Sequence, residues 1–201
     1  MKTINTMKTT KLFILVSLTS MSLLLSSCYS HKKVVQSSLP YSDKISWPKG
    51  YKPSEADFFV HNEIDIKASP QVVWDIFIHA AKWPEWHKKA KGIELLNSPN
   101  GKLNSSSVFI WYPAGKFTST IKEFNPPYNI AWYGESDNKK MTVYNAWMII
   151  PTEEGCKVVS NESQNGPKTK MEKIFAPNKV RKDIKDWLIR LKEQAEKQSN
   201  N

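Results

Sequence analysis

Residues 75–89 contain the side chains of this chain that most resemble a catalytic or metal-binding cluster. Asp75 and His79 are four residues apart on a predicted helix, so they would share one face, and His87 follows in the stretch "HAAKWPEWHKK". A zinc site needs three or four ligands at fixed spacing, and the sequence has neither an HExxH motif nor a pair of neighbouring cysteines. We therefore predict no metal and no other cofactor, and we expect His87 at the surface.

Other catalytic signatures are absent from the sequence. It has no GxSxG nucleophile motif and no glycine-rich phosphate loop, and only seven glycines occur in 201 residues. Cys156 and Cys28 are the only cysteines, so no internal disulfide is expected once the N-terminus is processed. Chemistry, if any, must come from side chains that the fold brings together.

The N-terminus has the pattern of an export signal. Lysines precede an apolar run over residues 12–25, which is too short and too rich in hydroxyl groups for a typical membrane-spanning helix. The run ends in "LSSC", which resembles the bacterial lipobox. We predict a signal peptide over residues 1–27 and lipidation of Cys28, with an ordinary secretory signal as the alternative. Because no Asp follows Cys28, we expect an outer-membrane lipoprotein that faces the periplasm.

The charge balance argues against nucleic-acid binding. The net charge is +10, but Arg181 and Arg190 are the only arginines, and nucleic-acid readers favour arginine. Solubility, or attraction to anionic lipid head groups, explains the lysines more simply. From Cys28 to residue 57 the chain is rich in Pro, Ser and Lys, which predicts a flexible tether, although Trp47 and Tyr51 could instead pack on the domain.

Residues 58–197 are predicted to form one α+β domain. Residues 60–68 alternate like a half-buried strand, Ser69-Pro70 begins a helix, and Pro84 begins a second short one. Six strand-like runs follow, at residues 92–97, 107–112, 117–124, 129–136, 141–150 and 156–163. A long amphipathic helix closes the chain, with apolar residues at Val180, Ile184, Trp187, Leu188, Leu191 and Ala195. Consecutive strands with short turns predict an antiparallel meander whose apolar face this helix covers.

Five segments together resemble the SRPBCC or START-like helix-grip superfamily, and most closely its polyketide cyclase/dehydrase and lipid-transport group. They are "IDIKASPQVVWDIF", "WPEWHKK", "NPPYNIAWYGE", "AWMIIPTEEGCKVVSNESQNG" and "DIKDWLIRLKEQAE", and the similarity runs over residues 60–196. The resemblance implies a curved seven-stranded antiparallel sheet that grips the C-terminal helix, two short helices after the first strand, and an apolar cavity between sheet and helix.

The resemblance also implies candidate site residues. Glu162 falls where members of the family often carry an acidic residue that faces the cavity, and a buried carboxyl there could act as an acid, a base or a hydrogen-bond anchor. The same family pattern turns Asn145, Trp147 and Trp132 inward, where they could bind a ligand, and Trp111 and Tyr144 are further candidates. Trp86 matches a recurrent tryptophan, which implies a cavity-mouth or packing role. Core packing remains the alternative for the tryptophans, and a structural hydrogen bond for Glu162.

These features predict a membrane-anchored protein that binds a small hydrophobic or amphipathic ligand. The alternative is a cyclase, dehydratase or hydrolase that uses Glu162 as its general acid or base. A third hypothesis is an envelope interaction module without a ligand, which an exposed apolar patch outside the cavity would favour.

Overall fold

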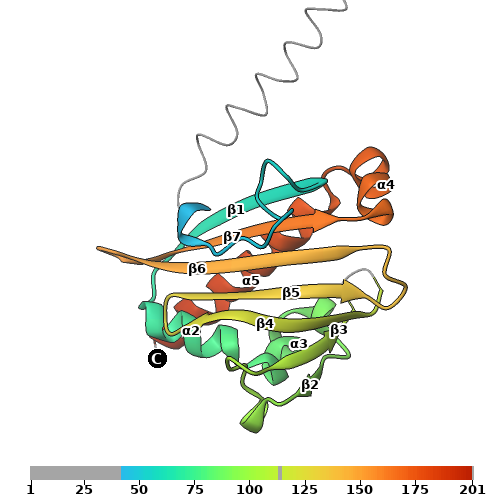
Figure 1. Cartoon of the computed structure of the whole chain (residues 1–201). Helices are drawn as coiled ribbons and strands as arrows, with labels where there is room; N and C mark the ends of the chain where they lie inside the picture. Colours follow the sequence, from blue (N-terminus) through green and yellow to red (C-terminus); the bar gives the residue numbers. More distant parts are fainter. Residues whose placement is uncertain (1–41, 113–114, 201) are drawn as a thin grey trace, which may run out of the picture. The chain divides into compact units, whose positions relative to one another are not determined.

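A computed structural model describes residues 42–112 and 115–200 (Figure 1). The predicted signal peptide, Cys28 and the first part of the predicted tether lie outside the described residues. Within the described part, the fold is a curved, fully antiparallel sheet of seven strands in the order β1-β7-β6-β5-β4-β3-β2, combined with a long C-terminal helix. The predicted α+β helix-grip fold is confirmed.

The strands follow the predicted runs closely. They are β1 (Phe58–Ile66), β2 (Glu94–Leu96), β3 (Val108–Trp111), β4 (Phe117–Asn125), β5 (Asn129–Ser136), β6 (Thr142–Thr152) and β7 (Gly155–Asn165). From β2 to β7 each strand pairs with the next one along the chain, as expected for strands joined by short turns. β1 pairs with β7, so the first and last strands of the chain are neighbours.

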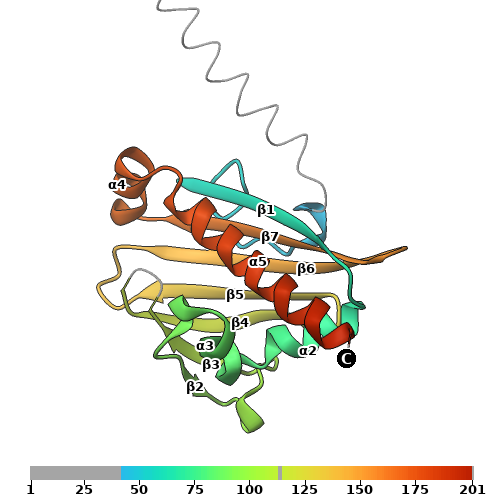
Figure 2. The ribbon, with the colours of Figure 1, turned by 180° about the vertical axis from the view of Figure 1, so that it is seen from behind.

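The concave face of the sheet is covered by α5 (Lys179–Ser199), which crosses it diagonally (Figure 2). The helix buries the predicted apolar stripe, which includes Ile184, Trp187, Leu188, Leu191 and Ala195. Its polar side reaches the outer edge of the sheet. Arg181 Nη1 donates to His61 O at 3.0 Å, and Lys192 Nζ donates to Asp65 O at 2.8 Å.

Short helices connect β1 to β2. They are α2 (Pro70–Ile78), η2 (Ala80–Lys82), α3 (Trp83–Trp86) and η3 (Lys88–Ala90). The Ser69 side chain accepts a hydrogen bond from the Val72 amide at the start of α2, and Pro84 lies in the first turn of α3, as predicted. The Trp83 side chain is fully buried and donates to Phe77 O at 2.7 Å.

The segment before β1 packs against the outer face of the sheet. Ile45 is buried with Tyr144 and Met148, and the Trp47 ring lies 5.7 Å from the ring of Tyr144. The Tyr51 hydroxyl donates to Thr142 Oγ1 at 2.6 Å. Residues 42–57 are therefore part of the folded unit and not a flexible tether. The packing of Trp47 and Tyr51 on the domain, which the sequence analysis left as the alternative, is the arrangement observed.

The sequence analysis missed one helix, α4 (Pro167–Phe175), between β7 and α5. It extends beyond the end of the sheet next to β1 and β7 (Figures 1 and 2). Of the helices formed by residues 42–112 and 115–200, none has the length and apolar character needed to cross a bilayer.

The packed segment predicts a specific loss of stability. Trp47→Ala removes a half-buried aromatic side chain from the outer face, so the free energy of unfolding should fall by about 2 kcal/mol. Lys49→Ala, at an exposed position two residues away, should change it by less than about 0.5 kcal/mol. Urea denaturation measures both values, and equal stabilities for the two variants would show that the segment is not packed in solution.

Candidate functional site

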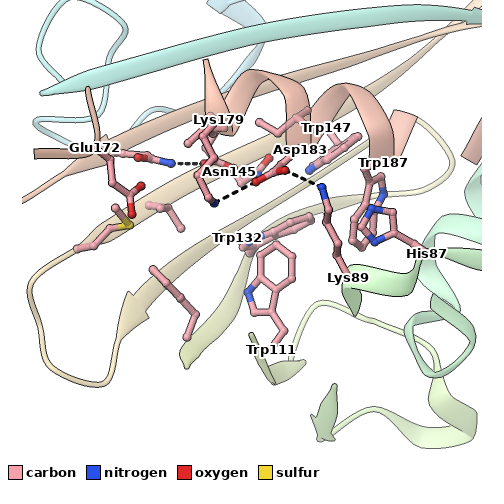
Figure 3. A pocket seen from close by; sticks show the side chains of 17 residues that line it. His87, Lys89, Trp111, Trp132, Asn145, Trp147, Glu172, Lys179, Asp183 and Trp187 are labelled. Atoms are coloured by element: carbon pink, nitrogen blue, oxygen red, sulfur yellow. Dashed lines mark hydrogen bonds and ion pairs between the residues drawn. The ribbon is translucent and has the colours of Figure 1, made fainter. Parts of the chain in front are cut away.

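A pocket of about 100 Å³ opens between the concave face of the sheet and the N-terminal half of α5. Its apolar lining consists of Trp111, Phe117, Trp132, Met141, Val143, Trp147, Val180, Ile184 and Trp187. Its polar lining consists of His87, Lys89, Asn145, Glu162, Gln164, Glu172, Lys179 and Asp183. Figure 3 shows the tryptophans with Lys89 and His87 toward one end, and Glu172 toward the other.

One row of residues paired across β5, β6 and β7 forms the base of the pocket. Trp132 of β5 is opposite Asn145 of β6, which is opposite Glu162 of β7. Because partners in an antiparallel register share a face, all three side chains point toward α5. Asn145 Nδ2 donates to Glu162 Oε2 at 2.5 Å, and Gln164 Nε2 donates to Glu162 Oε1 at 2.5 Å.

Glu162 is the most perturbed carboxyl of the site. Burial raises its pKa from the ordinary 4.5 to about 7, although the hydrogen bonds from Gln164 and Asn145 favour the carboxylate. The nearby Asp183 charge acts in the same direction as burial. Near neutral pH the side chain therefore exists in both protonation states, and it can donate or accept a proton or a hydrogen bond.

Aromatic rings form a continuous wall beside this carboxyl. The Trp132 and Trp147 rings are stacked with centroids 6.3 Å apart, and Trp111 meets Trp132 edge-on at 6.3 Å. Trp187 of α5 lies 6.3 Å from Trp147 and 4.9 Å from the buried Trp83. Such a wall offers large flat surfaces to an apolar ligand.

Charged side chains form the solvent-exposed rim. Lys89 Nζ lies 2.7 Å from Asp183 Oδ1, which joins η3 to α5 across the pocket (Figure 3). Lys179 Nζ lies 3.1 Å from Asp183 Oδ2. Burial alone would raise the pKa of Asp183, but the hydrogen bonds from Lys89 and Lys179 outweigh it and lower that pKa. The Asp183 hydrogen bond in turn raises the pKa of Lys89.

Several polar atoms of the lining have no hydrogen-bond partner in the described part of the protein. They are Asn145 Oδ1, Gln164 Oε1, both ring nitrogens of His87 and the indole Nε1 of Trp132, Trp147 and Trp187. All six side chains are at most 6% exposed. A buried polar group without a partner costs about 1–3 kcal/mol, so the pocket is suited to a molecule that brings both donors and acceptors.

The predicted site residues separate into two groups in the structure. Glu162, Asn145, Trp132 and Trp147 line the same pocket, whereas Trp86 does not. Trp86 packs on Trp187, with ring centroids 5.5 Å apart, and borders a different, mostly polar depression that also includes Asp75 and His79.

Two further expectations are corrected. His87 is not a surface residue: it is 3% exposed, its ring lies 4.5 Å from that of Trp187, and its Nε2 is 3.5 Å from Asp186 Oδ2. Burial lowers the pKa of His87 despite the nearby Asp186 carboxylate. Of the two additional cavity candidates, Trp111 lines the pocket, but Tyr144 faces the outer side and donates to Glu123 Oε1 at 2.6 Å.

Comparison with known proteins agrees with this geometry. The sequence pattern of the family described as polyketide cyclase / dehydrase and lipid transport matches residues 58–196. The chain belongs to this family. The match includes all seven strands, α4 and most of α5, so every residue that lines the pocket is part of the family domain. No curated protein shows a significant match to the chain.

Solved structures show the same fold. The hypothetical protein jhp0584 from Helicobacter pylori is 24% identical, with a TM-score of 0.69 over 75% of this chain and 95% of its own. A START superfamily protein from Mycobacterium smegmatis is 14% identical, with a TM-score of 0.53 over 69% of this chain and 97% of its own. Truncated norcoclaurine synthase from Thalictrum flavum is 13% identical, with a TM-score of 0.53 over 68% and 91%.

The sequence analysis missed the residues that complete the polar end of the pocket. Gln164 was detectable, because it lies two residues after Glu162 on the same strand and therefore on the same face. Asp183 and Lys179 are four residues apart on α5, a spacing that is typical of a solvated ion pair on a helix surface. Their position at the pocket depends on how α5 lies across the sheet, which the charge pattern of the helix does not reveal.

The buried carboxyl predicts an unusual pH dependence of stability. Folded Glu162 keeps its proton up to about pH 7, so between pH 4.5 and 7 the folded state binds more protons than the unfolded state. Between about pH 5 and pH 8, the free energy of unfolding of the wild type should therefore decrease by about 2–3 kcal/mol more than that of Glu162→Gln.

Urea denaturation of both proteins at the two pH values measures this difference. Glu153→Gln, at an exposed position in the β6–β7 turn, is the matched control and should follow the wild type at both pH values. Parallel behaviour of wild type and Glu162→Gln would mean that Glu162 is not desolvated in the folded protein.

Proposed function

We propose that this protein binds a small amphipathic ligand in the pocket between the sheet and α5. The observation that carries the proposal is the pairing of a buried carboxyl with an aromatic wall: Glu162, held by Asn145 and Gln164, shares one face of the sheet with the stacked rings of Trp132 and Trp147. Apolar surface with a few convergent polar groups is the usual composition of a small-molecule site. Membership of a cyclase and lipid-transport family supports the same class of ligand.

The polar groups of the pocket indicate the chemistry of the ligand. The indole N–H groups of Trp132, Trp147 and Trp187 require acceptors, and Asn145 Oδ1 requires a donor. A hydroxyl group on an unsaturated or aromatic ring satisfies both requirements while its ring contacts the tryptophans. We infer a ligand without a negative charge at this end of the pocket, because such a charge beside Glu162 and Asp183 would be repelled.

The size of the pocket limits what enters it. Its volume of about 100 Å³ is small beside the roughly 300–1,000 Å³ of typical ligand sites. A volume of this size accepts about one aromatic ring, so a second fused ring or a chain would extend toward the opening. The rest of a longer molecule would leave between the half-exposed side chains of Lys89, Lys179 and Asp183.

We further propose that the domain acts at a membrane in the bacterial envelope. The support is the signal pattern over residues 1–27 and the lipobox-like "LSSC", which would leave a lipidated Cys28 as the first residue of the mature chain. Mass spectrometry of the mature N-terminus tests this anchor. An unmodified chain that begins at another residue would contradict it.

An enzyme of the cyclase or dehydratase kind is the second candidate, and the state of Glu162 favours it. A carboxyl whose pKa is about 7 can act as general acid or base near neutral pH. Norcoclaurine synthase, which shares the fold, carries the name of an enzyme. If Glu162→Gln retains ligand binding and wild-type protein converts no bound ligand, the binding function stands alone.

A pair of probe ligands tests the binding proposal. We expect 2-naphthol to bind and to quench the fluorescence of the pocket tryptophans, because its hydroxyl can donate to Asn145 Oδ1 while its rings contact Trp132. Asn145→Leu should weaken 2-naphthol about tenfold, a loss of about 1.4 kcal/mol, and leave naphthalene, which has no hydroxyl, nearly unchanged.

Trp47→Phe, an aromatic substitution on the outer face, is the matched control and should bind both probes like the wild type. Equal losses for the two probes in Asn145→Leu would contradict the assigned hydrogen bond. Failure of both probes to bind wild-type protein would count against the proposed site itself. Mass spectrometry of small molecules that co-purify with the domain identifies the natural ligand.

A further inference from the structure

Helix α4 presents its apolar side chains to solvent. Met171, Ile174 and Phe175 are 61%, 71% and 79% exposed, which makes them the three most exposed large apolar side chains of residues 42–112 and 115–200. Their spacing places them on one face of the helix. Single exposed apolar residues are ordinary, but a contiguous exposed group of three large ones on one helix indicates a surface that another body covers.

The orientation of α4 is fixed from its opposite face. Thr169 is fully buried, and helical geometry places it on the side away from Met171, Ile174 and Phe175. Asp57 holds the inner side of the helix: its Oδ2 accepts from the Gly166 amide at 3.0 Å, and its backbone oxygen accepts from Lys173 Nζ at 2.9 Å. The apolar face is therefore directed outward by the fold and cannot turn toward the core without breaking these bonds.

The charge around this face is positive. The β5–β6 turn lies against the start of α4, because the Lys168 amide donates to Lys140 O at 3.1 Å. Six lysines belong to the helix, this turn and the residue paired with it, against the three carboxylates Asp57, Asp137 and Glu172: they are Lys116, Lys139, Lys140, Lys168, Lys170 and Lys173. Lys170 and Lys173 contact Asp57, and Lys168 Nζ lies 3.9 Å from Glu172 Oε1, so the excess is three positive charges. A short apolar face with an excess of nearby lysines is the pattern of a helix that lies in the interface of an anionic bilayer.

We propose that α4 docks this protein on an anionic phospholipid surface, with Ile174, Phe175 and Met171 inserted among the lipid head groups. The charge around the helix favours such a surface over a second copy of this chain, whose own α4 would bring the same lysines. This contact is separate from the N-terminal lipid anchor and does not require it.

The docking surface adjoins the pocket. Glu172 of α4 and Lys179, the first residue of α5, both belong to the pocket lining. A membrane bound at α4 would therefore lie next to the charged rim of the site. A ligand taken from the membrane would then reach the pocket without a passage through bulk water. This last step rests on the proposed function.

Vesicle binding tests the docking proposal. The chain from residue 29 onward contains the whole described unit and lacks Cys28, so a lipid anchor cannot contribute. We expect it to co-sediment with mixed phosphatidylcholine–phosphatidylglycerol vesicles, to bind pure phosphatidylcholine vesicles weakly, and to dissociate as salt is raised. Ile174→Ser/Phe175→Ser should lower the affinity for mixed vesicles at least about tenfold.

Matched variants separate the docking face from general effects. Leu96→Ser changes an exposed apolar residue at the opposite end of the sheet and should bind like the wild type. Lys139→Gln/Lys140→Gln should weaken binding, whereas Lys91→Gln/Lys122→Gln, which removes the same charge elsewhere, should weaken it less.

Three results would overturn the proposal: no binding of wild type to mixed vesicles, equal binding by Ile174→Ser/Phe175→Ser, or a dimer without vesicles that this variant dissociates. Binding of 2-naphthol without vesicles is read separately, and it should be equal in wild type and in Ile174→Ser/Phe175→Ser. If the wild type does not bind mixed vesicles but still binds 2-naphthol, docking alone is refuted. The reverse result refutes the pocket proposal alone.

Discussion

The two longest strands, β6 and β7, are buried along most of their length, so the sheet must be covered on both faces. On the concave face α5 supplies the cover, and on the outer face residues 42–57 supply it through Ile45 and Trp47. On the concave side, α5 leaves space above Asn145 and Glu162, and that space is the candidate site.

The site depends on a balance between desolvation and hydrogen bonding at one carboxyl. An apolar substitute for Glu162 would pack more easily beside the tryptophans, since an ionised carboxylate loses its hydration there. Asn145 and Gln164 offset part of that cost, and they keep the oxygen atoms of Glu162 in one orientation. The family relationship establishes the fold, whereas the chemistry of the site has to be argued from these side chains.

Local patterns predicted the fold well, because alternation and helical spacing are properties of neighbouring residues. They placed all seven strands and the apolar stripe of α5 through Trp187 and Leu191. They failed where a distant element decides. His87 looks like part of a solvated "HKK" run, yet α5 buries it, and α4 was missed because its apolar residues face outward and give no core-facing stripe. Glu162 and Asn145 were found through the family resemblance combined with alternation.

The hydrogen bonds from α5 to β1 have a consequence for association. β1 is an edge strand, and an open edge can recruit a strand from another molecule. Arg181 and Lys192 donate to the outward carbonyls of His61 and Asp65, so cationic side chains occupy two of the acceptors that an incoming strand would need. The opposite edge, β2, is only three residues long. The sheet is therefore guarded at both edges against edge-to-edge aggregation, although its strands never close into a barrel.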